Sequence, residues 1–340
     1  MSSVKGREVR LAVRPTGRPT AANFEVVAVE TPAPAAGQVL LKNRWVSVDP
    51  MIRILIDARP LGGTAPPLPI GAVIPGAAVA EVVASEHPEL KTGDIVEGRI
   101  GWREYAISDG SGLRRVDPQD GPISQALGAL GLPGFSAYVG LKINGEVKPG
   151  QTVVVSGAAG AVGSVAGLLI KLAGGTAVGI AAGEDRCRAL TETLGYDRAV
   201  DRLAPDFEAR LAEALPSGAE LYFDNVGGPL FTQLLQHLNR GARVTICGLM
   251  AEYVDGGEHP GPDRLPDVLQ AIMGRGLTIK AFSNQEHLDM RAPFLREVGA
   301  LVREGRLKVP EHVSEGIENI PVAFSRLFTD AVVGKSVVRL

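Results

Sequence analysis

The sequence predicts a mixed α/β protein with two domains, and three observations support this prediction. The chain has 340 residues, which at roughly 150 residues per domain corresponds to two domains with large buried cores. As far as about residue 125, short β-branched runs are separated by turn residues, which is typical of an all-β unit. From about residue 126, strands alternate with helical stretches, a pattern that predicts a parallel sheet with helices on both faces.

In the first part of the chain, four short apolar runs predict strands. They cover residues 24–29, 39–42, 79–84 and 95–98. Between the second and third strands lies the segment 60–75, which is too rich in Pro and Gly for a helix or a strand. We expect an ordered surface loop there.

In the second part, strands and helices are expected in alternation. The expected strands are 153–156, 177–181, 221–224 and 243–247, and the expected helices are 161–173, 185–194, 229–238 and 294–304. The closing segment 320–340 contains a helical stretch and then a strand at 335–339, which we expect to return to the first domain.

Charge and hydropathy exclude several classes of protein. The net charge is −3 and no block of Lys or Arg stands out, so a nucleic-acid partner is not expected. Residues 152–170 carry no charge and are as long as a minimal membrane span, but they divide into a strand, a small-residue stretch and a helix. Neither a membrane span nor a secretory signal is therefore expected, and we expect a cytoplasmic protein.

A glycine-rich stretch links the strand at 153–156 to the helix at 161–173. It reads Ser-Gly-Ala-Ala-Gly-Ala-Val-Gly from 156 to 163. Against the dinucleotide fingerprint G-x-G-x-x-G, the three positions are Ala158, Gly160 and Gly163. Gly160 would let a pyrophosphate approach the backbone, and Gly163 would let the helix pack closely on the strand. The helix N-terminus then favours the anion.

The end of the second strand favours NADP over NAD. An NAD site usually places an acid there to hold the ribose 2′-hydroxyl, whereas residues 181–183 are Ala-Ala-Gly. Arg186 and Arg188 follow, and a guanidinium matches the geometry of a phosphate. Glu184 or Asp185 could instead reach a ribose hydroxyl, or all four charges could form the solvated first turn of a helix.

Several motifs together resemble a known family, and they keep their order along nearly the whole chain. They are Ser47-Val-Asp-Pro50, Gly101-Trp-Arg-Glu-Tyr105, the glycine stretch, Phe223-Asp-Asn-Val-Gly-Gly228, and Cys247-Gly248 with Tyr253. The chain resembles the zinc-independent medium-chain dehydrogenase/reductases, within them the group of prostaglandin reductase (leukotriene B4 12-hydroxydehydrogenase) and alkenal double-bond reductase.

The resemblance implies an architecture and an activity. A GroES-like β-barrel catalytic domain would comprise residues 1–128 and 301–340, and a Rossmann domain that binds NADP(H) would comprise residues 129–300. Members of the group reduce the carbon–carbon double bond of α,β-unsaturated aldehydes and ketones, usually as dimers. We therefore expect a small-molecule enone or enal substrate and a homodimer.

The resemblance also assigns roles to single residues. The residues expected to contact the cofactor are Gly160, Ala161, Val162 and Gly163 at the pyrophosphate, Arg186 at the 2′-phosphate, Asn225, Cys247, Gly248 and Tyr253 at the nicotinamide side, and Phe282, Ser283 and Asn284 closing the pocket. Met51 and Tyr253 are expected to face the substrate.

Three positions depart from the family pattern. Arg202 stands where the family has a tyrosine that contacts the cofactor, and it could add a phosphate contact. Val332 replaces an asparagine ahead of Gly334-Lys335, which removes an amide. Met51 replaces an aromatic residue. These changes bear on cofactor affinity and on the range of substrates.

Tyr253 is the expected catalytic residue. Hydride transfer to the β-carbon of an enone pushes negative charge onto the carbonyl oxygen, so a positioned hydrogen-bond donor accelerates the reaction. A phenol with an unperturbed pKa of about 10 is protonated at neutral pH. Tyr253 could also relay the proton to the α-carbon, although solvent could do so equally well.

A metal site is not expected, and two alternative functions stay open. Cys187 and Cys247 are the only cysteines, they form no Cys-x-x-Cys pair, and the five histidines form no paired motif of a zinc site. A quinone reductase would use the same fold, and a nucleotide-binding protein without turnover would keep the cofactor site. The loops 60–75 and 254–266 are where we expect substrate specificity to be determined.

Overall fold

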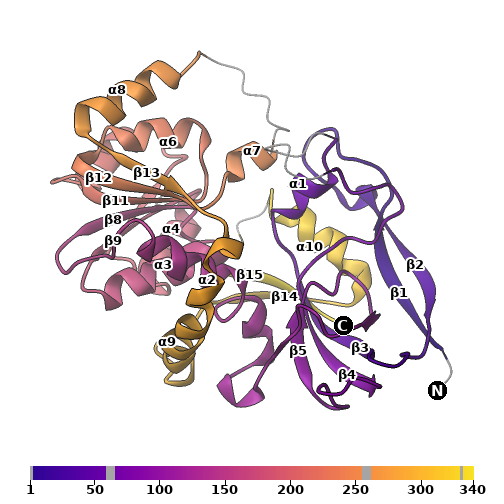
Figure 1. The fold of residues 1–340 in the computed structure, drawn as a ribbon. Helices are drawn as coiled ribbons and strands as arrows, with labels where there is room; N and C mark the ends of the chain where they lie inside the picture. Colours follow the sequence, from indigo (N-terminus) through magenta and orange to yellow (C-terminus); the bar gives the residue numbers. More distant parts are fainter. Residues whose placement is uncertain (1–2, 59–65, 255–261, 330–331) are drawn as a thin grey trace. The chain divides into compact units, whose positions relative to one another are not determined.

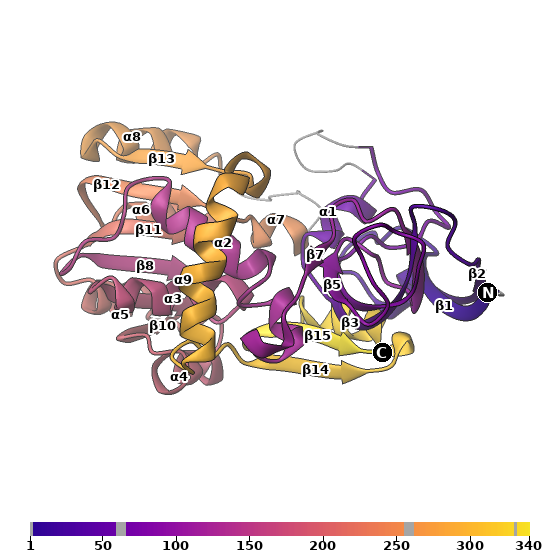
Figure 2. The ribbon, with the colours of Figure 1, turned by 60° about the horizontal axis from the view of Figure 1, so that its bottom comes forward.

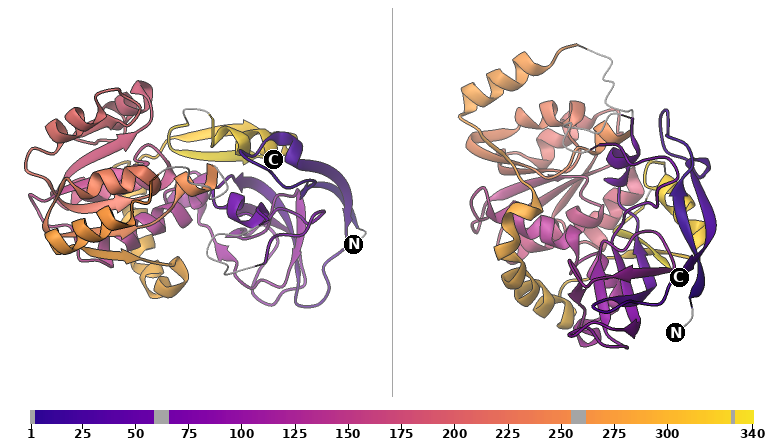
Figure 3. Two further views of the ribbon diagram at one scale, coloured as in Figure 1. Left: turned by 90° about the horizontal axis from the view of Figure 1, so that it is seen from above. Right: turned by 45° about the vertical axis from the view of Figure 1, so that its right-hand side comes forward.

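The computed structural model describes residues 3–58, 66–254, 262–329 and 332–340 of the chain. It divides into two compact units. The antiparallel unit comprises Met1–Leu127, Glu311–Asp330 and Ser336–Leu340, and the parallel-sheet unit comprises Gly128–Pro310 and Ala331–Lys335. The indigo and yellow ends of the ribbon in Figure 3 thus belong to the same unit.

The antiparallel unit contains a two-stranded and a seven-stranded sheet. Its strands are β1 (Val4–Leu11), β2 (Phe24–Thr31), β3 (Val39–Ser47), β4 (Ala78–Ser85), β5 (Ile95–Gly98), β6 (Tyr105–Ser108), β7 (Arg114–Arg115), β14 (Glu311–Glu315) and β15 (Lys335–Arg339), and its helices are α1 (Ile52–Ile56) and α10 (Ile320–Arg326). All four strands expected in the first part of the chain are confirmed. The expected C-terminal strand is β15, which pairs antiparallel with β3.

An aromatic cluster fills part of the core of the antiparallel unit. Trp102 is fully buried, and its ring centroid lies 5.7 Å from that of Phe24 and 5.6 Å from that of Phe324. Its indole N–H donates to the backbone oxygen of Ser47 at 3.0 Å, which satisfies the buried polar atom. A Cβ at Gly76 would lie 2.7 Å from that indole nitrogen, so only glycine fits there.

The parallel-sheet unit has six strands in the order β10-β9-β8-β11-β12-β13 (Figure 1). These strands are β8 (Thr152–Ser156), β9 (Thr176–Ala181), β10 (Arg198–Asp201), β11 (Ala219–Asp224), β12 (Leu238–Ile246) and β13 (Thr278–Ala281). The helices are α2 (Leu132–Lys142), α3 (Ala161–Leu172), α4 (Glu184–Glu192), α5 (Phe207–Ala214), α6 (Gly228–Leu235), α7 (Met250–Val254), α8 (Leu265–Arg275) and α9 (Arg291–Arg303). The predicted fold class, an all-β part followed by a doubly wound parallel sheet, is confirmed.

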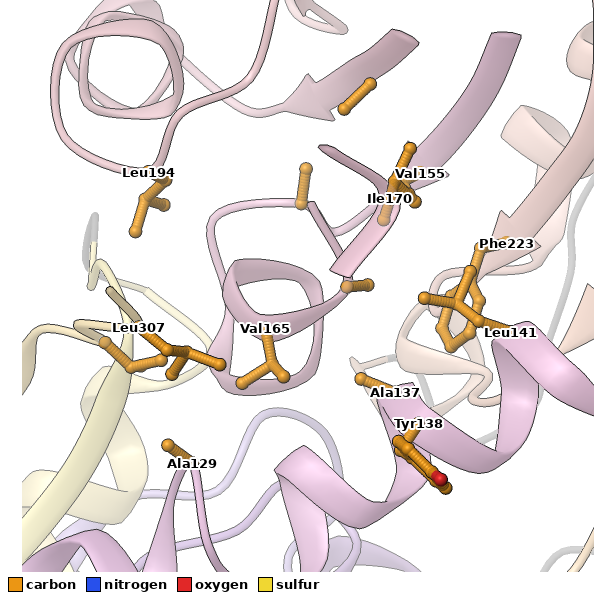
Figure 4. Packing of buried hydrophobic residues seen from close by; sticks show 14 of the residues in the cluster. Ala129, Ala137, Tyr138, Leu141, Val155, Val165, Ile170, Leu194, Phe223 and Leu307 are labelled. Atoms are coloured by element: carbon orange, nitrogen blue, oxygen red, sulfur yellow. The ribbon is translucent and has the colours of Figure 1, made fainter. Parts of the chain in front are cut away.

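Two hydrophobic cores cover the two faces of the parallel sheet, because successive side chains of a strand point to opposite faces. Val153 and Val155 pack in one core with residues of α2, α3 and α9, helices that Figure 2 labels. Figure 4 shows Val155 of this core with Val165 of α3 and Leu141 of α2. Val154, between them, packs in the other core with residues of α5, α6 and α8. Both faces are thus shielded from water, as a parallel sheet requires.

Several boundaries differ from the sequence prediction. The helix expected at 229–238 ends at Leu235, because β12 begins at Leu238. The short strands β10 and β13, at the two edges of the sheet, were not expected, nor were α5 and α8. Residues 301–310, which the sequence analysis assigns to the first domain, cluster with the parallel-sheet unit, since Leu307 and Val309 are buried in its core.

The uncharged stretch 152–170 is divided between β8, the glycine loop and α3. Among the described residues, every helix falls short of the length and apolar character that a membrane span requires. Of the two loops expected to shape the substrate pocket, residues 59–65 and 255–261 lie outside the described part. The described remainder of the first, 66–75, contains neither helix nor strand, and in the second α8 begins at Leu265.

The packing of α3 predicts a large cost for a single added methyl group. A Cβ at Gly167 would lie 2.3 Å from the ring of Tyr196, which is buried and donates its hydroxyl to the Gly163 oxygen at 2.6 Å. We expect Gly167→Ala to lower the free energy of unfolding by about 1–3 kcal/mol, measured by chemical denaturation. A matched control is Gly274→Ala on α8, where a Cβ meets nothing within 4 Å, and a gain of about 0.5–1 kcal/mol is expected. Equal effects of the two variants would contradict this account.

Candidate cofactor site

The glycine loop between β8 and α3 has the backbone that the sequence analysis expects. A Cβ at Gly163 would lie 2.5 Å from the oxygen of Ala158, so glycine is required for α3 to pack on the loop. A Cβ at Gly160 would meet only the oxygen of Gly157, at 3.3 Å, so the space beside Gly160 is open. No described side chain caps α3 at Gly160, which leaves the N–H groups of its first turn for an anion. The loop therefore fits a dinucleotide pyrophosphate.

The segment before β15 lies along this loop. The Gly334 N–H donates to the Ala159 oxygen at 2.8 Å, and Gly334 forms a parallel bridge with Gly160. Gly334 has φ +80°, and a Cβ there would lie 2.0 Å from the oxygen of Pro310. The departure at Val332 thus falls in a segment that contacts the glycine loop.

The order of the strands identifies the edge of the sheet where a ligand fits. From β8 the chain continues to β9 and β10 on one side, whereas β11 is followed by β12 and β13 on the other side. In open α/β sheets, ligands bind beyond the carboxyl ends of the strands at such a switch point. Ser156 and Asp224 are the last residues of β8 and β11, so both lie at this point.

A buried carboxylate connects the two strands at the switch point. Asp224 is fully buried, and its carboxylate accepts hydrogen bonds from the hydroxyls of Ser156 and Tyr222, both at 2.6 Å. It also accepts from the N–H groups of Val226 at 3.0 Å and Gly227 at 3.1 Å. Burial and the Asp224 charge hold the pKa of Tyr222 well above its usual range, so its hydroxyl remains a donor. The donors compensate for the loss of hydration of the carboxylate.

The turn after Asp224 positions Asn225 and α7. The Asn225 side-chain amide donates to the Ser156 oxygen, and its backbone N–H donates to the Ser156 hydroxyl, both at 2.8 Å. The first N–H groups of α7 bond to the same turn: Met250 donates to the Asn225 oxygen at 3.2 Å and Ala251 to the Val226 oxygen at 2.9 Å. The position of α7 is therefore set by the turn that Asp224 holds.

Cys247 and Gly248 are held by the backbone of the same aspartate. The backbone N–H groups of both residues donate to the backbone carbonyl oxygen of Asp224, at 2.7 Å from Cys247 and 3.2 Å from Gly248. Burial and the Asp224 charge raise the pKa of the Cys247 thiol to about 12, so this thiol stays protonated at neutral pH. Among the described residues, no three His, Cys, Asp or Glu side chains form a group that could hold a metal ion.

Tyr253 lies on α7 and is partly buried. Its hydroxyl oxygen accepts a hydrogen bond from the Leu249 N–H at 3.4 Å, which leaves its own proton available for donation. Burial raises the pKa of Tyr253 above its ordinary value. The structure thus brings Tyr253, Asn225, Cys247 and Gly248 together around one turn.

The two arginines expected at the 2′-phosphate follow neighbouring strands. Arg186 lies in the first turns of α4 and is partly buried, and Arg202 follows β10 and is exposed. Arg188 is exposed and pairs with Asp185 at 3.5 Å. For these two charges, the structure shows the solvated helix surface that was one of the open alternatives.

Phe282, Ser283 and Asn284 follow β13 at the same edge of the sheet as Cys247, since Ile246 and Ala281 are paired in neighbouring strands. The Asn284 amide donates to the Ser136 hydroxyl at 2.7 Å. Its side-chain oxygen is buried, and among the described residues nothing donates to it. An unsatisfied acceptor at this edge is compatible with a polar group of a bound cofactor.

Met51 belongs to the antiparallel unit, where it directly precedes α1 and is 43% exposed. Its expected role toward the substrate stays a prediction. A separate cavity of about 650 Å³ is lined by residues of α5, α6 and α8 and of the start of β12. It is at the amino ends of the strands, away from the glycine loop. Two of its charged groups, on Arg240 and Arg275, already donate to backbone oxygens.

Comparison with known proteins identifies the family. Residues 7–116 match a family model described as the N-terminal domain of oxidoreductase, and residues 161–297 match one described as zinc-binding dehydrogenase. The NADPH-dependent curcumin reductase of Escherichia coli (strain K12) is 39% identical over 337 residues, 99% of this chain and 97% of that protein. Prostaglandin reductase 1 of Rattus norvegicus is 36% identical over 328 residues, 95% of each chain.

The chain belongs to the medium-chain dehydrogenase/reductase family. The crystal structure of CurA from Vibrio vulnificus in complex with NADPH is 37% identical, covers 98% of both chains and superimposes with a TM-score of 0.92. A quinone oxidoreductase of Pseudomonas syringae, 22% identical with a TM-score of 0.77, shares the fold alone. The family and group expected from the motifs are confirmed, and the chain is an NADP(H)-dependent oxidoreductase.

Asp224, Ser156 and Tyr222 belong to the site although their residue types in the sequence did not predict a role for them. Asp224 lies within one of the quoted motifs, and an acid that ends an apolar strand is unusual. That signal could have indicated a buried carboxylate. Its partner Ser156 lies 68 residues earlier, and only the pairing of the strands brings the two together.

The switch-point network predicts a loss of both stability and cofactor affinity for Asp224→Asn. The new amide would direct N–H donors at existing donors, which leaves buried groups unsatisfied at a cost of about 1–3 kcal/mol. We expect a lower free energy of unfolding and a raised KM for NADPH, measured by denaturation and steady-state kinetics.

Tyr222→Phe, which removes one donor to Asp224, should show both effects more weakly. Asp117→Asn is the control, because Asp117 accepts from the Gln119 N–H in the antiparallel unit. An unchanged KM in Asp224→Asn would refute the positioning role.

Proposed function

We propose that this protein reduces the carbon–carbon double bond of α,β-unsaturated aldehydes and ketones with NADPH, and that Tyr253 stabilises the enolate. The observation that supports this most is the state of the Tyr253 hydroxyl, a protonated donor held by α7 beside Cys247 and Gly248. The relatives named curcumin reductase and prostaglandin reductase 1 support the same class of activity.

Under this proposal the parallel-sheet unit binds the cofactor with the residues that the sequence analysis expects. The N–H groups of Ala161, Val162 and Gly163 hold the pyrophosphate, with Gly160 leaving room for it. Arg186 and Arg202 bind the 2′-phosphate, since guanidinium groups match phosphate oxygens in geometry and charge. The nicotinamide side is lined by Asn225, Cys247, Gly248 and Tyr253, and the pocket is closed by Phe282, Ser283 and Asn284.

The chemistry divides into a hydride step and a proton step. Bound NADPH supplies a hydride to the β-carbon. As the double bond shifts, the electron pair moves to the carbonyl oxygen, where the Tyr253 hydroxyl donates a hydrogen bond to the developing charge. A proton then reaches the α-carbon, from Tyr253 or from solvent. One hydride and one proton are thus added across the double bond.

The proposal includes three further expectations about this protein. It is located in the cytoplasm, it forms a homodimer, and Met51 contacts the substrate. The contribution of Arg202 to phosphate binding and the consequence of valine at 332 belong with them, because both positions depart from the family pattern.

A panel of acceptors tests the proposed reaction. Oxidation of NADPH, followed by the loss of its absorbance, should be observed with enals and enones and should yield the saturated carbonyl compound, identified by mass spectrometry. Faster oxidation with quinones than with every enone would favour a quinone reductase instead. Binding of NADPH without oxidation by any acceptor would favour a nucleotide-binding protein without turnover.

Tyr253→Phe tests the enolate donor. Removing one donor of this kind lowers kcat by a factor of about 10²–10³, whereas the affinity for NADPH should change little.

Because burial raises the pKa of Tyr253, its hydroxyl stays protonated to a higher pH than a free phenol. The wild-type rate with an enone should therefore stay level up to a pH of about 10 and fall only above it, and the variant should lack this fall. Tyr105→Phe in β6 is the control. A fully active Tyr253→Phe would refute the role.

A further inference from the structure

The two segments that carry Arg186 and Arg202 leave the sheet side by side. Ala181 and Asp201 end the neighbouring parallel strands β9 and β10 and are paired in register. Beyond Ala181 the chain turns at Gly183 into α4, which carries Arg186, and beyond Asp201 comes Arg202 itself. Whether the two guanidinium groups meet one phosphate thus depends on how these two turns are held together.

Asp201 connects the two turns through one carboxylate oxygen. Its Oδ1 atom accepts a hydrogen bond from the Gly183 N–H at 2.7 Å and from the Leu203 N–H at 2.9 Å. In the opposite direction, the Arg202 N–H donates to the Ala181 oxygen at 2.9 Å. Three hydrogen bonds therefore fix the start of α4 against the backbone of Arg202.

The backbone at Gly183 depends on this arrangement. Gly183 has φ +92°, a conformation that strains any other residue, and it stands at the N-cap of α4 without a described side chain capping it. A Cβ there would meet nothing within 4 Å, so the space beside the turn is open. The carboxylate of Asp201 supplies the acceptor that the turn needs.

The charge of Asp201 is close to α4. Burial and the Asp201 charge raise the pKa of Cys187, the residue after Arg186, to about 11. Asp201 is nevertheless occupied by backbone donors and is not placed at the end of β9, where an acid binds the ribose 2′-hydroxyl in NAD sites. Asp201 thus supports the two turns that follow β9 and β10.

We propose that Asp201 is a positioning residue for discrimination between NADPH and NADH, because it holds the turns of Arg186 and Arg202 together at the 2′-phosphate. The inference rests on the proposed function for the cofactor site. In the described part of the chain, the hydrogen bonds that the Asp201 side chain accepts come from backbone N–H groups, and it acts through the two arginines. Under this proposal Asp201, an acid at the end of β10, favours binding of NADPH over NADH.

Calorimetric binding of adenosine 2′,5′-bisphosphate and of adenosine 5′-monophosphate to the full chain tests this inference. Wild type should bind the bisphosphate at least tenfold more tightly. Asp201→Ala should lose most of this ratio, whereas Asp201→Asn, which keeps an acceptor oxygen, should retain it within about threefold. Arg186→Ala should lower the ratio as Asp201→Ala does. The kcat/KM ratio for NADPH over NADH should change in parallel.

Asp197→Ala is the matched control. Asp197 also accepts a backbone hydrogen bond, from the Ala177 N–H at 2.8 Å, but at the amino end of the same two strands. Its loss should lower stability without changing the nucleotide ratio. An unchanged ratio in Asp201→Ala, an equal loss in Asp197→Ala, or a wild type without discrimination would each overturn the inference. The binding measurement requires no turnover, so a wild type that fails to reduce enones refutes the proposed reaction and leaves this test in force.

Discussion

The candidate site depends on one buried carboxylate, that of Asp224 at the switch point of the parallel sheet. A carboxylate without contact to water is stable only where donors surround it, and here two hydroxyls and two backbone N–H groups do so. These donors come from β8, from β11 and from the turn that leads to α6, so the separation of the two strands and the shape of the turn are fixed together. The peptide oxygen of Asp224 adds Cys247 and Gly248 to the same group.

Asp201 and Asp224 follow one principle at different ends of the site. Each ends a parallel strand, and each accepts a hydrogen bond from a backbone N–H group of the turn that follows, Asp201 from Leu203 and Asp224 from Gly227. Asp201 accepts a further hydrogen bond from Gly183, in the turn after β9. A charge-assisted hydrogen bond to a backbone donor is short and strong, so the conformation of the turn becomes nearly rigid. The side chains proposed to meet the cofactor, Asn225 after Asp224 and Arg202 after Asp201, come one residue later. An acid at the end of a strand therefore need not bind a ribose hydroxyl, since the donors that surround it decide its role.

Sequence reasoning predicts those parts of the structure that are determined by residues close together in the chain. The glycine loop is predicted because strand, glycines and helix are contiguous, and β5 and β15 because β-branched residues are adjacent within a short run. The strands β10 and β13 were missed, because Arg-Ala-Val-Asp and Thr-Ile-Lys-Ala have too few apolar residues to distinguish an edge strand from a loop. The roles of Asp224 and Asp201 were missed for another reason: their partners lie 68 and 18 residues away along the chain, and only the assembled sheet brings them into contact.

The placement of Tyr253 illustrates why such contacts matter for the proposed mechanism. Five residues cannot form a stable helix by themselves, because the cost of nucleation exceeds what one or two turns return. The geometry of α7 must therefore come from its surroundings, and its first N–H groups bond to the oxygens of Asn225 and Val226. Gly228 permits this approach, since a Cβ there would lie 2.9 Å from that of Ala251. The Tyr253 hydroxyl, which we propose meets a developing charge within a fraction of an ångström, is thus mounted on a short helix. The position of this helix is fixed by the turn after the buried carboxylate of Asp224, four residues before α6 begins at Gly228.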